Sequence, residues 1–365
     1  MKTIHLVAGA RPNFMKIAPL YHALTKEPWC RCMIVHTGQH YDAQMSDAFF
    51  ADLGLPTPDI DLNVGSGTHA EQTAAVMTAY EKVCMAAPPD LVIVVGDVNS
   101  TLACTLAAKK LCLPVAHLEA GLRSGDRTMP EEINRIVTDS IADYLWTPSP
   151  DGDENLLREG VGASRIRRVG NIMIDSLEML RPRIEARRMA DELKLVRSGY
   201  AVVTLHRPVN VDSEANLKTI VASLKNLAGD LPLVFPAHPR TRANLRKFGL
   251  LDGLASHSGL RLLEPLGYID FMSLVFTARL IVTDSGGIQE ETTYLGIPCL
   301  TLREATERPI TVTQGTNRLV KLDALEKTAR AVLTQPAGAA RSRPDLWDGE
   351  TASRIVAALR EIFPN

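Results

Sequence analysis

The sequence predicts an α/β protein of two doubly wound domains, each built on a parallel sheet with helices on both faces. Three observations support this fold class. The chain has 365 residues, more than one hydrophobic core usually organises. Short apolar runs alternate along the chain with longer segments of helical spacing. The runs are continuously apolar, as is typical of strands that are buried on both faces of a parallel sheet.

The first domain is predicted over residues 1–170 and the second over 171–350. Strands of the first are expected at 3–7, 33–35, 91–95, 115–118 and 144–146. Strands of the second are expected at 201–205, 233–235, 260–263, 280–283 and 299–302. The last helix, 352–362, is amphipathic, and we expect the C-terminal segment 351–365 to pack back on the first domain.

Composition and charge exclude several classes of protein. The chain is 45% hydrophobic and 22% charged, as globular proteins are. Its net charge of −2 argues against a nucleic-acid surface or a polybasic membrane patch. The apolar stretches are shorter than a membrane span or a secretory signal. The six cysteines are scattered among apolar segments, with no second pair at zinc spacing beside Cys30 and Cys32. We therefore expect free thiols, a cytoplasmic protein and no metal.

Acidic residues follow the predicted strands of the first domain. Asp97 comes directly after one buried strand and Glu119 after the next, and Glu131 with Glu132 opens the helix that follows. Asp97 or Asn99 alone could be a helix cap. Three acids from consecutive strand–helix connections are more than capping requires, and ligands of this architecture bind at the carboxyl ends of strands. The residues Asp97, Glu119 and Glu131 are therefore predicted to be acid–base catalysts.

Two cations stand at the start of the first predicted helix. Arg11 and Lys16 follow the first strand, where helix amides already favour anions. This loop has no G-x-G-x-x-G fingerprint, so the sequence does not support a nicotinamide or flavin cofactor. The cations are predicted to bind substrate.

The second domain carries anion-binding signals at its strand ends. His206 and His238 each follow a predicted strand. The run Ser285-Gly286-Gly287 joins a strand to a helix, where hydroxyl and amide donors can face an anion. Glu291 lies further along that helix and suits ribose hydroxyls, whereas Walker A spacing is absent. An isolated turn of this kind would carry little weight; its coincidence with the other motifs favours a nucleotide site.

Together these motifs resemble the non-hydrolysing UDP-N-acetylglucosamine 2-epimerase family over nearly the full chain. The matching segments are GARPNFMK (9–16), TGQH (37–40), VGDVNST (95–101), HLEAGLRSGD (117–126), PEEINR (130–135), VGN (169–171), HRPVNVD (206–212), TDSGGIQEE (283–291), LGIPCLTLR (295–303) and TERP (306–309). The resemblance implies two Rossmann-like domains of glycosyltransferase-B type that face a central cleft. It also implies a homodimer and a role in cell-surface polysaccharide biosynthesis.

The resemblance further implies the reaction and several binding roles. Family members convert UDP-GlcNAc to UDP-ManNAc by anti elimination of UDP to a 2-acetamidoglucal and re-addition of UDP, without a cofactor. By family position, Glu291 would hold the ribose and Arg308 the phosphates. Phe271 and the backbone of Leu266 would hold the uracil. His206 would stabilise the departing diphosphate and act in catalysis. Which carboxylate is the base in each direction stays open.

Three segments depart from the family pattern. Pro208-Val209 stands where Arg-Glu is common, Asn13-Phe14 where Glu-Ala is frequent, and Gln39-His40 is followed by Tyr41-Asp42 instead of an Arg. These segments resemble the place where bacterial members bind a second UDP-sugar as activator. We therefore expect weak or absent allosteric activation, checked by initial rates against UDP-GlcNAc concentration; sigmoidal kinetics would contradict it.

Alternative functions stay open at this point. The departures leave room for a modified substrate such as a UDP-2,3-diacetamido uronic acid. A hydrolysing relative would release UDP and free ManNAc. A glycosyltransferase of the same architecture, or a nucleotide-sugar-binding regulator, belongs to a different class. The three carboxylates argue against a regulator without chemistry.

Overall fold

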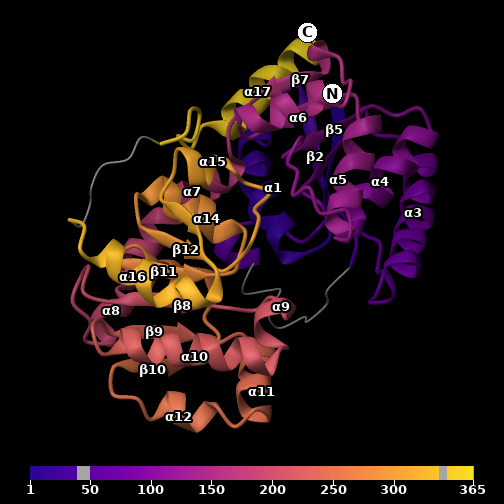
Figure 1. Ribbon diagram of the computed structural model, residues 1–365. Coiled ribbons are helices and arrows are strands. Elements are labelled where there is room, and N and C mark those ends of the chain that lie inside the picture. The colour runs from indigo at the N-terminus through magenta and orange to yellow at the C-terminus, as the bar shows by residue number, and fades with distance from the viewer. Residues whose placement is uncertain (39–49, 337–342, 365) are drawn as a thin grey trace. The chain divides into compact units, whose positions relative to one another are not determined.

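The computed structural model describes residues 1–38, 50–336 and 343–364 of the chain. It divides into two compact units, Met1–Met179 with Asp345–Asn365, and Leu180–Pro344. Each unit contains its own parallel sheet flanked by helices (Figure 1). Within the described residues, no helix has the length and apolar character that a membrane span requires.

The first unit contains a parallel sheet of seven strands in its described residues, in the order β3-β2-β1-β4-β5-β6-β7. The strands are β1 Lys2–Ala8, β2 Cys30–His36, β3 Ile60–Asp61, β4 Leu91–Val95, β5 Val115–Leu118, β6 Tyr144–Thr147 and β7 Ile166–Arg168. The helices are α1 Arg11–Leu24, α3 His69–Ala86, α4 Asn99–Lys110, α5 Pro130–Ile141, α6 Pro150–Arg158, α7 Ile172–Arg187 and α17 Thr351–Ile362. Helix α7 runs from the first unit into the second.

Local sequence explains why these elements begin where they do. Strand β4 is apolar and buried along its whole length, as the central strand of a covered sheet must be. Helix α3 begins with a capping box, in which Thr68 and Glu71 each accept a hydrogen bond from the other's backbone amide. Helix α5 starts at Pro130, whose missing amide costs nothing in the first turn.

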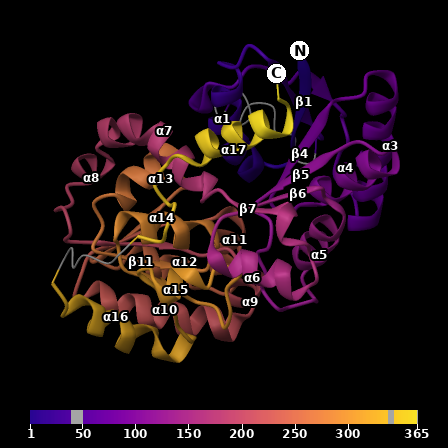
Figure 2. The same cartoon turned by 90° about the horizontal axis from the view of Figure 1, so that it is seen from above.

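The C-terminal helix α17 belongs to the first unit. Figure 2 shows α17 beside α1 on one side of the sheet, with α3 and α4 on the other. Asp175 accepts a hydrogen bond from the Ala352 amide at 2.8 Å, and Trp347 donates to the Pro148 carbonyl at 3.0 Å. These buried contacts attach the end of the chain to the first sheet.

The second unit contains a parallel sheet of six strands in its described residues, in the order β10-β9-β8-β11-β12-β13. The strands are β8 Ala201–Thr204, β9 Leu233–Pro236, β10 Leu260–Leu263, β11 Leu280–Thr283, β12 Cys299–Thr301 and β13 Asn317–Leu319. The helices are α8 Met189–Glu192, α9 Pro208–Val211, α10 Glu214–Ala228, α11 Pro239–Lys247, α12 Leu251–Ala255, α13 Tyr268–Val275, α14 Gly287–Leu295, α15 Ile310–Thr313 and α16 Leu325–Leu333.

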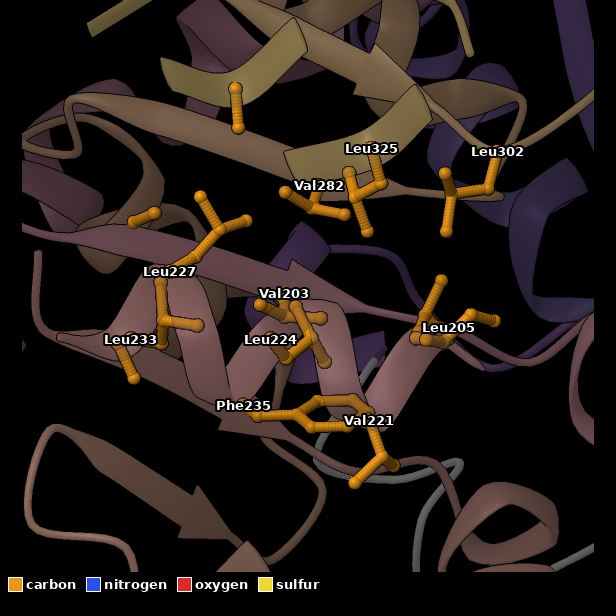
Figure 3. Close-up of a cluster of buried hydrophobic side chains, with 14 of the residues drawn as sticks. Val203, Leu205, Val221, Leu224, Leu227, Leu233, Phe235, Val282, Leu302 and Leu325 are labelled. Atoms are coloured by element: carbon orange, nitrogen blue, oxygen red, sulfur yellow. The ribbon is translucent and has the colours of Figure 1, made fainter. Parts of the chain in front are cut away.

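The core of the second unit forms between its sheet and helices α10 and α16. Figure 3 shows Val203 and Phe235 of the sheet against Val221 and Leu224 of α10. The apolar residues of α10 recur at helical spacing, so one face of the helix is buried. Each such aliphatic side chain contributes about 1.5–3 kcal/mol on burial. The predicted class, two doubly wound α/β domains, is confirmed.

Candidate active site

Both sheets reverse their winding direction at their centre. In the first sheet the chain goes from β1 to β2 in one direction and from β4 to β5 in the other; in the second, β8 and β11 stand at the same kind of point. Ligands of doubly wound sheets bind at such switch points, beyond the carboxyl ends of the strands. Nearly all predicted catalytic and binding residues lie beyond these strand ends or those of their neighbours.

In the first unit, Lys16 and Glu119 form a buried ion pair. The Lys16 ammonium on α1 contacts Oε2 of Glu119, and their side chains are 10% and 3% exposed. Gly96 makes room for the pair: a Cβ there would lie 3.0 Å from the Lys16 nitrogen and 3.4 Å from Oε2. Among the described residues, Oε1 of Glu119 is buried without a hydrogen-bond partner. A carboxylate with one oxygen held and the other unsatisfied is suited to interact with substrate.

The backbone at Glu119 is unusual. Its φ of 71° lies in the left-handed region, which costs a non-glycine residue about 1–3 kcal/mol. Such strain persists only where surrounding contacts enforce it. The strand-end turn is thus shaped to aim the Glu119 side chain toward Lys16.

Asp97 lies at the end of β4 and pairs with an arginine of α5. The Arg135 guanidinium contacts the Asp97 carboxylate, and Arg135 also binds Glu132 at 2.7 Å. The Asp97 side chain is 31% exposed, whereas those of Arg135 and Glu132 are 3% and 2% exposed. The Asp97 carboxylate is therefore held by Arg135 and is at the same time partly exposed to solvent.

The two glutamates that begin α5 have different environments. Glu132 is buried, and it accepts hydrogen bonds from the amides of Ser124 and Gly125 at 2.9–3.1 Å. These amides and Arg135 hold the pKa of Glu132 below its usual value, although burial alone would raise it. Glu131 is half-buried, and within the described ranges its carboxylate has no protein partner. Glu132 is therefore held by the protein itself, and the catalytic role predicted for Glu131 stays a prediction.

The loop between β1 and α1 is held by Asn13. Its side chain accepts a hydrogen bond from the Ala10 amide at 2.9 Å and donates one to the Val95 carbonyl at 3.0 Å. Arg11 begins α1 in this loop, and burial lowers the pKa of its guanidinium while Asp52 opposes the effect. Asn13 therefore links the loop that carries Arg11 to the end of β4.

Sequence reasoning missed a buried network beneath these acids. His117 of β5 binds Asp139 of α5 at 2.6 Å, and Asp139 also binds Arg123 at 2.7 Å. His117 and Arg123 were visible in the HLEAGLR segment, but only as flanking residues. Asp139 lies in the middle of a helical segment, and nothing local distinguishes it from a solvent-exposed position.

In the second unit, the buried Asp284 organises the loop after β8. Its carboxylate accepts hydrogen bonds from the amides of His206 and Arg207, each at 3.0 Å, and from the Asn210 side chain at 3.0 Å. Nδ1 of His206 lies 3.3 Å from the same carboxylate. Asp284 was missed as a functional residue because the sequence shows it only as the residue before the Ser285 turn.

His206 is a partly exposed histidine in this loop. Burial lowers the pKa of its imidazole; Asp284 raises it, and His238, Arg207 and Arg303 lower it further. The rings of His206 and His238 lie 5.7 Å apart. Nδ1 of His238 accepts the Arg240 amide at 3.2 Å and so caps α11. The structure thus brings the two predicted histidines together.

The Ser285-Gly286-Gly287 turn leads from β11 into α14. The Ser285 amide donates to the Thr283 hydroxyl at 3.0 Å, and Gln289 donates to the Ser285 carbonyl at 3.0 Å. A Cβ at Gly286 would lie 2.8 Å from the Glu307 carboxylate and 3.1 Å from the Arg308 guanidinium, so a larger residue there would have to displace the ends of these side chains. At Gly287 a Cβ would meet no atom within 4 Å.

Arg308 lies between two buried carboxylates. Its Nε is 2.9 Å from Glu290 and its Nη1 is 2.6 Å from Glu307, which also binds Arg303 at 2.7 Å. Burial would raise the pKa of Glu307, but Arg308 and Arg303 hold it far below its usual value. The positive charge of Arg308 is therefore already balanced inside the protein, and its predicted role at the phosphates stays a prediction.

Glu291 is buried in α14 and receives a hydrogen bond from Tyr268 of α13. The Tyr268 hydroxyl donates to Oε1 of Glu291 at 2.7 Å. Burial raises the pKa of Glu291 to about 7, with Tyr268 opposing and Glu290 adding to the rise. Phe271 lies one turn along α13 from Tyr268, and Leu266 lies in the loop before it; both are half-buried. The predicted ribose and uracil residues thus come from neighbouring elements.

Some predicted features lie beyond what the structure describes. Gln39, His40, Tyr41 and Asp42, on which the expected loss of allosteric activation partly rests, fall outside the described residues. Within residues 1–38, 50–336 and 343–364, no group of three or more His, Cys, Asp or Glu side chains is arranged to hold a metal ion.

Comparison with known proteins agrees with this geometry. Residues 22–360 match the family described as UDP-N-acetylglucosamine 2-epimerase. A UDP-N-acetylglucosamine 2-epimerase of Methanocaldococcus jannaschii is 42% identical over 364 residues, covering 98% of both chains. A UDP-2,3-diacetamido-2,3-dideoxy-D-glucuronate 2-epimerase of Pseudomonas aeruginosa is 40% identical over 363 residues, again covering 98% of both.

A solved structure gives the same result. The crystal structure of Methanocaldococcus jannaschii UDP-GlcNAc 2-epimerase in complex with UDP-GlcNAc and UDP has a TM-score of 0.88 to this chain at 41% identity, and the match covers 98% of this chain and 99% of that one. Sequence and structure therefore agree over nearly the whole length, and the protein belongs to the UDP-N-acetylglucosamine 2-epimerase family, whose members are isomerases built from two Rossmann-like domains of glycosyltransferase-B type.

Proposed function

We propose that the protein interconverts UDP-GlcNAc and UDP-ManNAc by inverting C2 of the sugar. The observation that carries the proposal is the set of three carboxylates: Asp97 follows β4, Glu119 follows β5, and Glu131 lies in the first turn of α5, which comes after β5 as well. One is paired with a buried lysine, one with a buried arginine, and one is left without a protein partner among the described residues. Such differently held acids are what proton removal and return require.

The proposed reaction has two steps. A carboxylate removes the proton at C2 while the C1–oxygen bond to UDP breaks, which leaves UDP and a 2-acetamidoglucal. UDP then re-forms the bond at C1, and an acid returns a proton to the opposite face of C2. Arg11, Lys16, His206 and the Ser285-Gly286-Gly287 turn would stabilise the charge of the departing diphosphate.

Exchange with heavy water tests the proposal directly. UDP-GlcNAc incubated with the enzyme in deuterium oxide should gain deuterium at C2, because the returned proton comes from solvent. Nuclear magnetic resonance of the recovered sugar measures it. Release of free ManNAc in step with UDP would point to a hydrolysing enzyme, and absence of exchange would favour a glycosyltransferase.

One of the related proteins supports an alternative substrate. The Pseudomonas aeruginosa relative named for a diacetamido glucuronate is almost as similar to this chain as the Methanocaldococcus jannaschii enzyme. We therefore propose a UDP-2,3-diacetamido uronic acid as the alternative substrate. The same exchange measurement on both sugars, compared by kcat/KM, decides between them.

We also propose the oligomeric state, location, partners and pathway of the enzyme. We expect a homodimer in the cytoplasm that takes a UDP-sugar, needs no cofactor and binds neither nucleic acid nor membrane, in the biosynthesis of cell-surface polysaccharides. The six cysteines, free among the described residues, fit a reducing compartment. Sedimentation equilibrium measures the subunit count, and a monomer at assay concentration would contradict the dimer.

The affinity for UDP-GlcNAc should fall as the pH drops below 7. In the protein without substrate, the carboxyl of Glu291 has a pKa of about 7, and its ionised form accepts a stronger hydrogen bond from a ribose hydroxyl than its neutral form does. Affinity should therefore be highest above pH 7 and fall as the pH drops below it, levelling off near the affinity of a variant with an uncharged side chain at this position. Titration calorimetry on the Glu119→Gln variant measures binding without turnover.

The matched control is the same variant carrying Glu291→Gln in addition. It should bind more weakly above pH 7 and lose most of the pH dependence, because glutamine does not titrate. Protonation of His206 at lower pH favours binding of the diphosphate, and it does so in both proteins. The difference in pH dependence between the two proteins therefore reports the effect of Glu291. Equal slopes in the two proteins would rule out the assigned role.

A further inference from the structure

His117 is a buried histidine near the end of β5, and both of its ring nitrogens face oxygen atoms. Nδ1 lies 2.6 Å from Oδ1 of Asp139, and Nε2 lies 2.8 Å from the carbonyl oxygen of Gly96. A carbonyl oxygen only accepts hydrogen bonds, so Nε2 carries a proton. The side chains of His117 and Asp139 have no exposure to solvent.

The charge of Asp139 decides whether Nδ1 carries a proton as well. Its other oxygen accepts hydrogen bonds from the Gly121 amide at 3.0 Å and from the Arg123 guanidinium at 2.7 Å. These two donors, one of them the permanently charged Arg123, stabilise the ionised form of the Asp139 carboxylate independently of His117. An ionised Asp139 has no proton to donate, so the proton of the 2.6 Å hydrogen bond belongs to Nδ1.

We infer that His117 is a buried imidazolium and that, together with Asp139, it is a positioning residue for the catalytic carboxylates. The Gly96 carbonyl that His117 holds belongs to the peptide bond with Asp97. The Gly121 amide that Asp139 holds lies two residues after Glu119. One ion pair therefore connects the ends of β4 and β5, from which Asp97 and Glu119 project.

The surroundings explain why a charged pair is used here. Glu119 has left-handed backbone with φ of 71°, which is strained for a non-glycine residue, so this turn needs strong contacts to persist. The charges near the pair within the described residues include Arg123 on the Asp139 carboxylate, Arg165 at the Asp139 carbonyl and, beyond Gly96, the Lys16–Glu119 ion pair. Charge-assisted hydrogen bonds are shorter and stronger than neutral ones, which suits a support that must fix two strand ends.

The charge of His117 can be observed on the whole protein with nitrogen-15-labelled histidine. Both ring nitrogens of His117 should give imidazolium signals at neutral pH. His5 is the internal reference, since it is equally buried in β1, bonds the Tyr80 hydroxyl at 3.0 Å, and has a pKa lowered to about 4 by burial, with Asp59 opposing. Signals are assigned by their loss in His117→Gln and His5→Gln. An unprotonated Nδ1 of His117 at neutral pH would overturn the inference.

The positioning role is tested by turnover per folded molecule in the same two variants. This part rests on the proposed function. His117→Gln should lower kcat by roughly 10- to 100-fold, because small misplacements of catalytic groups are costly. His5→Gln removes a comparable buried histidine from the same sheet and should leave turnover per folded molecule unchanged. UDP affinity should be unchanged in both, because the proposed uridine and ribose contacts lie in the second unit.

The possible outcomes distinguish the inference about His117 from the proposed epimerase function. Equal losses of turnover in both variants, or full turnover in His117→Gln, would show that His117 is not a positioning residue. Failure of the wild-type enzyme to exchange C2 hydrogen would defeat the proposed function and leave the nitrogen signals to decide the charge of His117. Circular dichroism and thermal melting give the folded fraction that both comparisons require.

Discussion

Replacing Glu119 with glutamine should lower kcat by roughly 10²- to 10⁴-fold, the usual contribution of a positioned acid or base. Glutamine keeps the shape of the side chain but neither removes nor returns a proton at neutral pH. Asp97→Asn and Glu131→Gln should each have a comparable effect. UDP affinity should change far less, since most of the proposed UDP contacts lie in the second unit. Steady-state rates and titration calorimetry measure the two quantities.

Two controls accompany this series. Asp126→Asn removes an exposed carboxylate that only caps its own loop through Thr128, and turnover should be retained. Thermal melting of Glu119→Gln is needed because the substitution leaves Lys16 buried without its counter-ion, which destabilises proteins. If all three carboxylate variants kept near wild-type turnover, the assignment of the acids would be wrong.

Gly121→Ala should strongly destabilise the first unit. The residue has φ of 82°, and a Cβ would lie 2.8 Å from the Cα of Gly152 and closer still to its carbonyl oxygen. Backbone atoms cannot move aside as the end of a long side chain can. Left-handed strain and overpacking together should cost about 2–6 kcal/mol in the free energy of unfolding.

Gly125→Ala is the matched control for this prediction. Its φ of 75° is nearly the same, but a Cβ would meet no atom within 4 Å. Only the backbone strain remains, so the cost should be roughly 1 kcal/mol. Urea unfolding of the three proteins compares the free energies. Equal losses in the two variants would mean that the Gly152 contact does not matter.

Much of the fold could be predicted from the sequence. All ten predicted strands are confirmed, because short, continuously apolar runs between helical segments are typical of buried parallel strands. The strands β3, β7 and β13 were missed. They have two or three residues each, and their side chains are mostly half-exposed, so no continuous apolar run identifies them. Their pairing is decided by the neighbouring strand rather than by their own sequence.

The candidate site, like the fold, could be predicted only in part from the sequence. Asp97, Glu119 and Glu131 could be found from the sequence, because each stands at a strand end or helix start that local patterns reveal. Their partners could not. Asp97 meets Arg135, Glu119 meets Lys16, and these pairs are separated by 38 and 103 residues. Only the order of strands in the sheet brings such residues together.

The sequence by itself determined the alternating elements, the acidic and anion-binding strand ends and the family to which they point. The tertiary structure decided which charged side chains have a counter-charge within the protein and which do not. Glu132 and Arg308 carry the same charges as functional residues would, yet both are buried against counter-charges, whereas Glu131 has no protein partner among the described residues. The physical reason is that a buried charge must be paired, and the partner is supplied by packing rather than by neighbours in the chain.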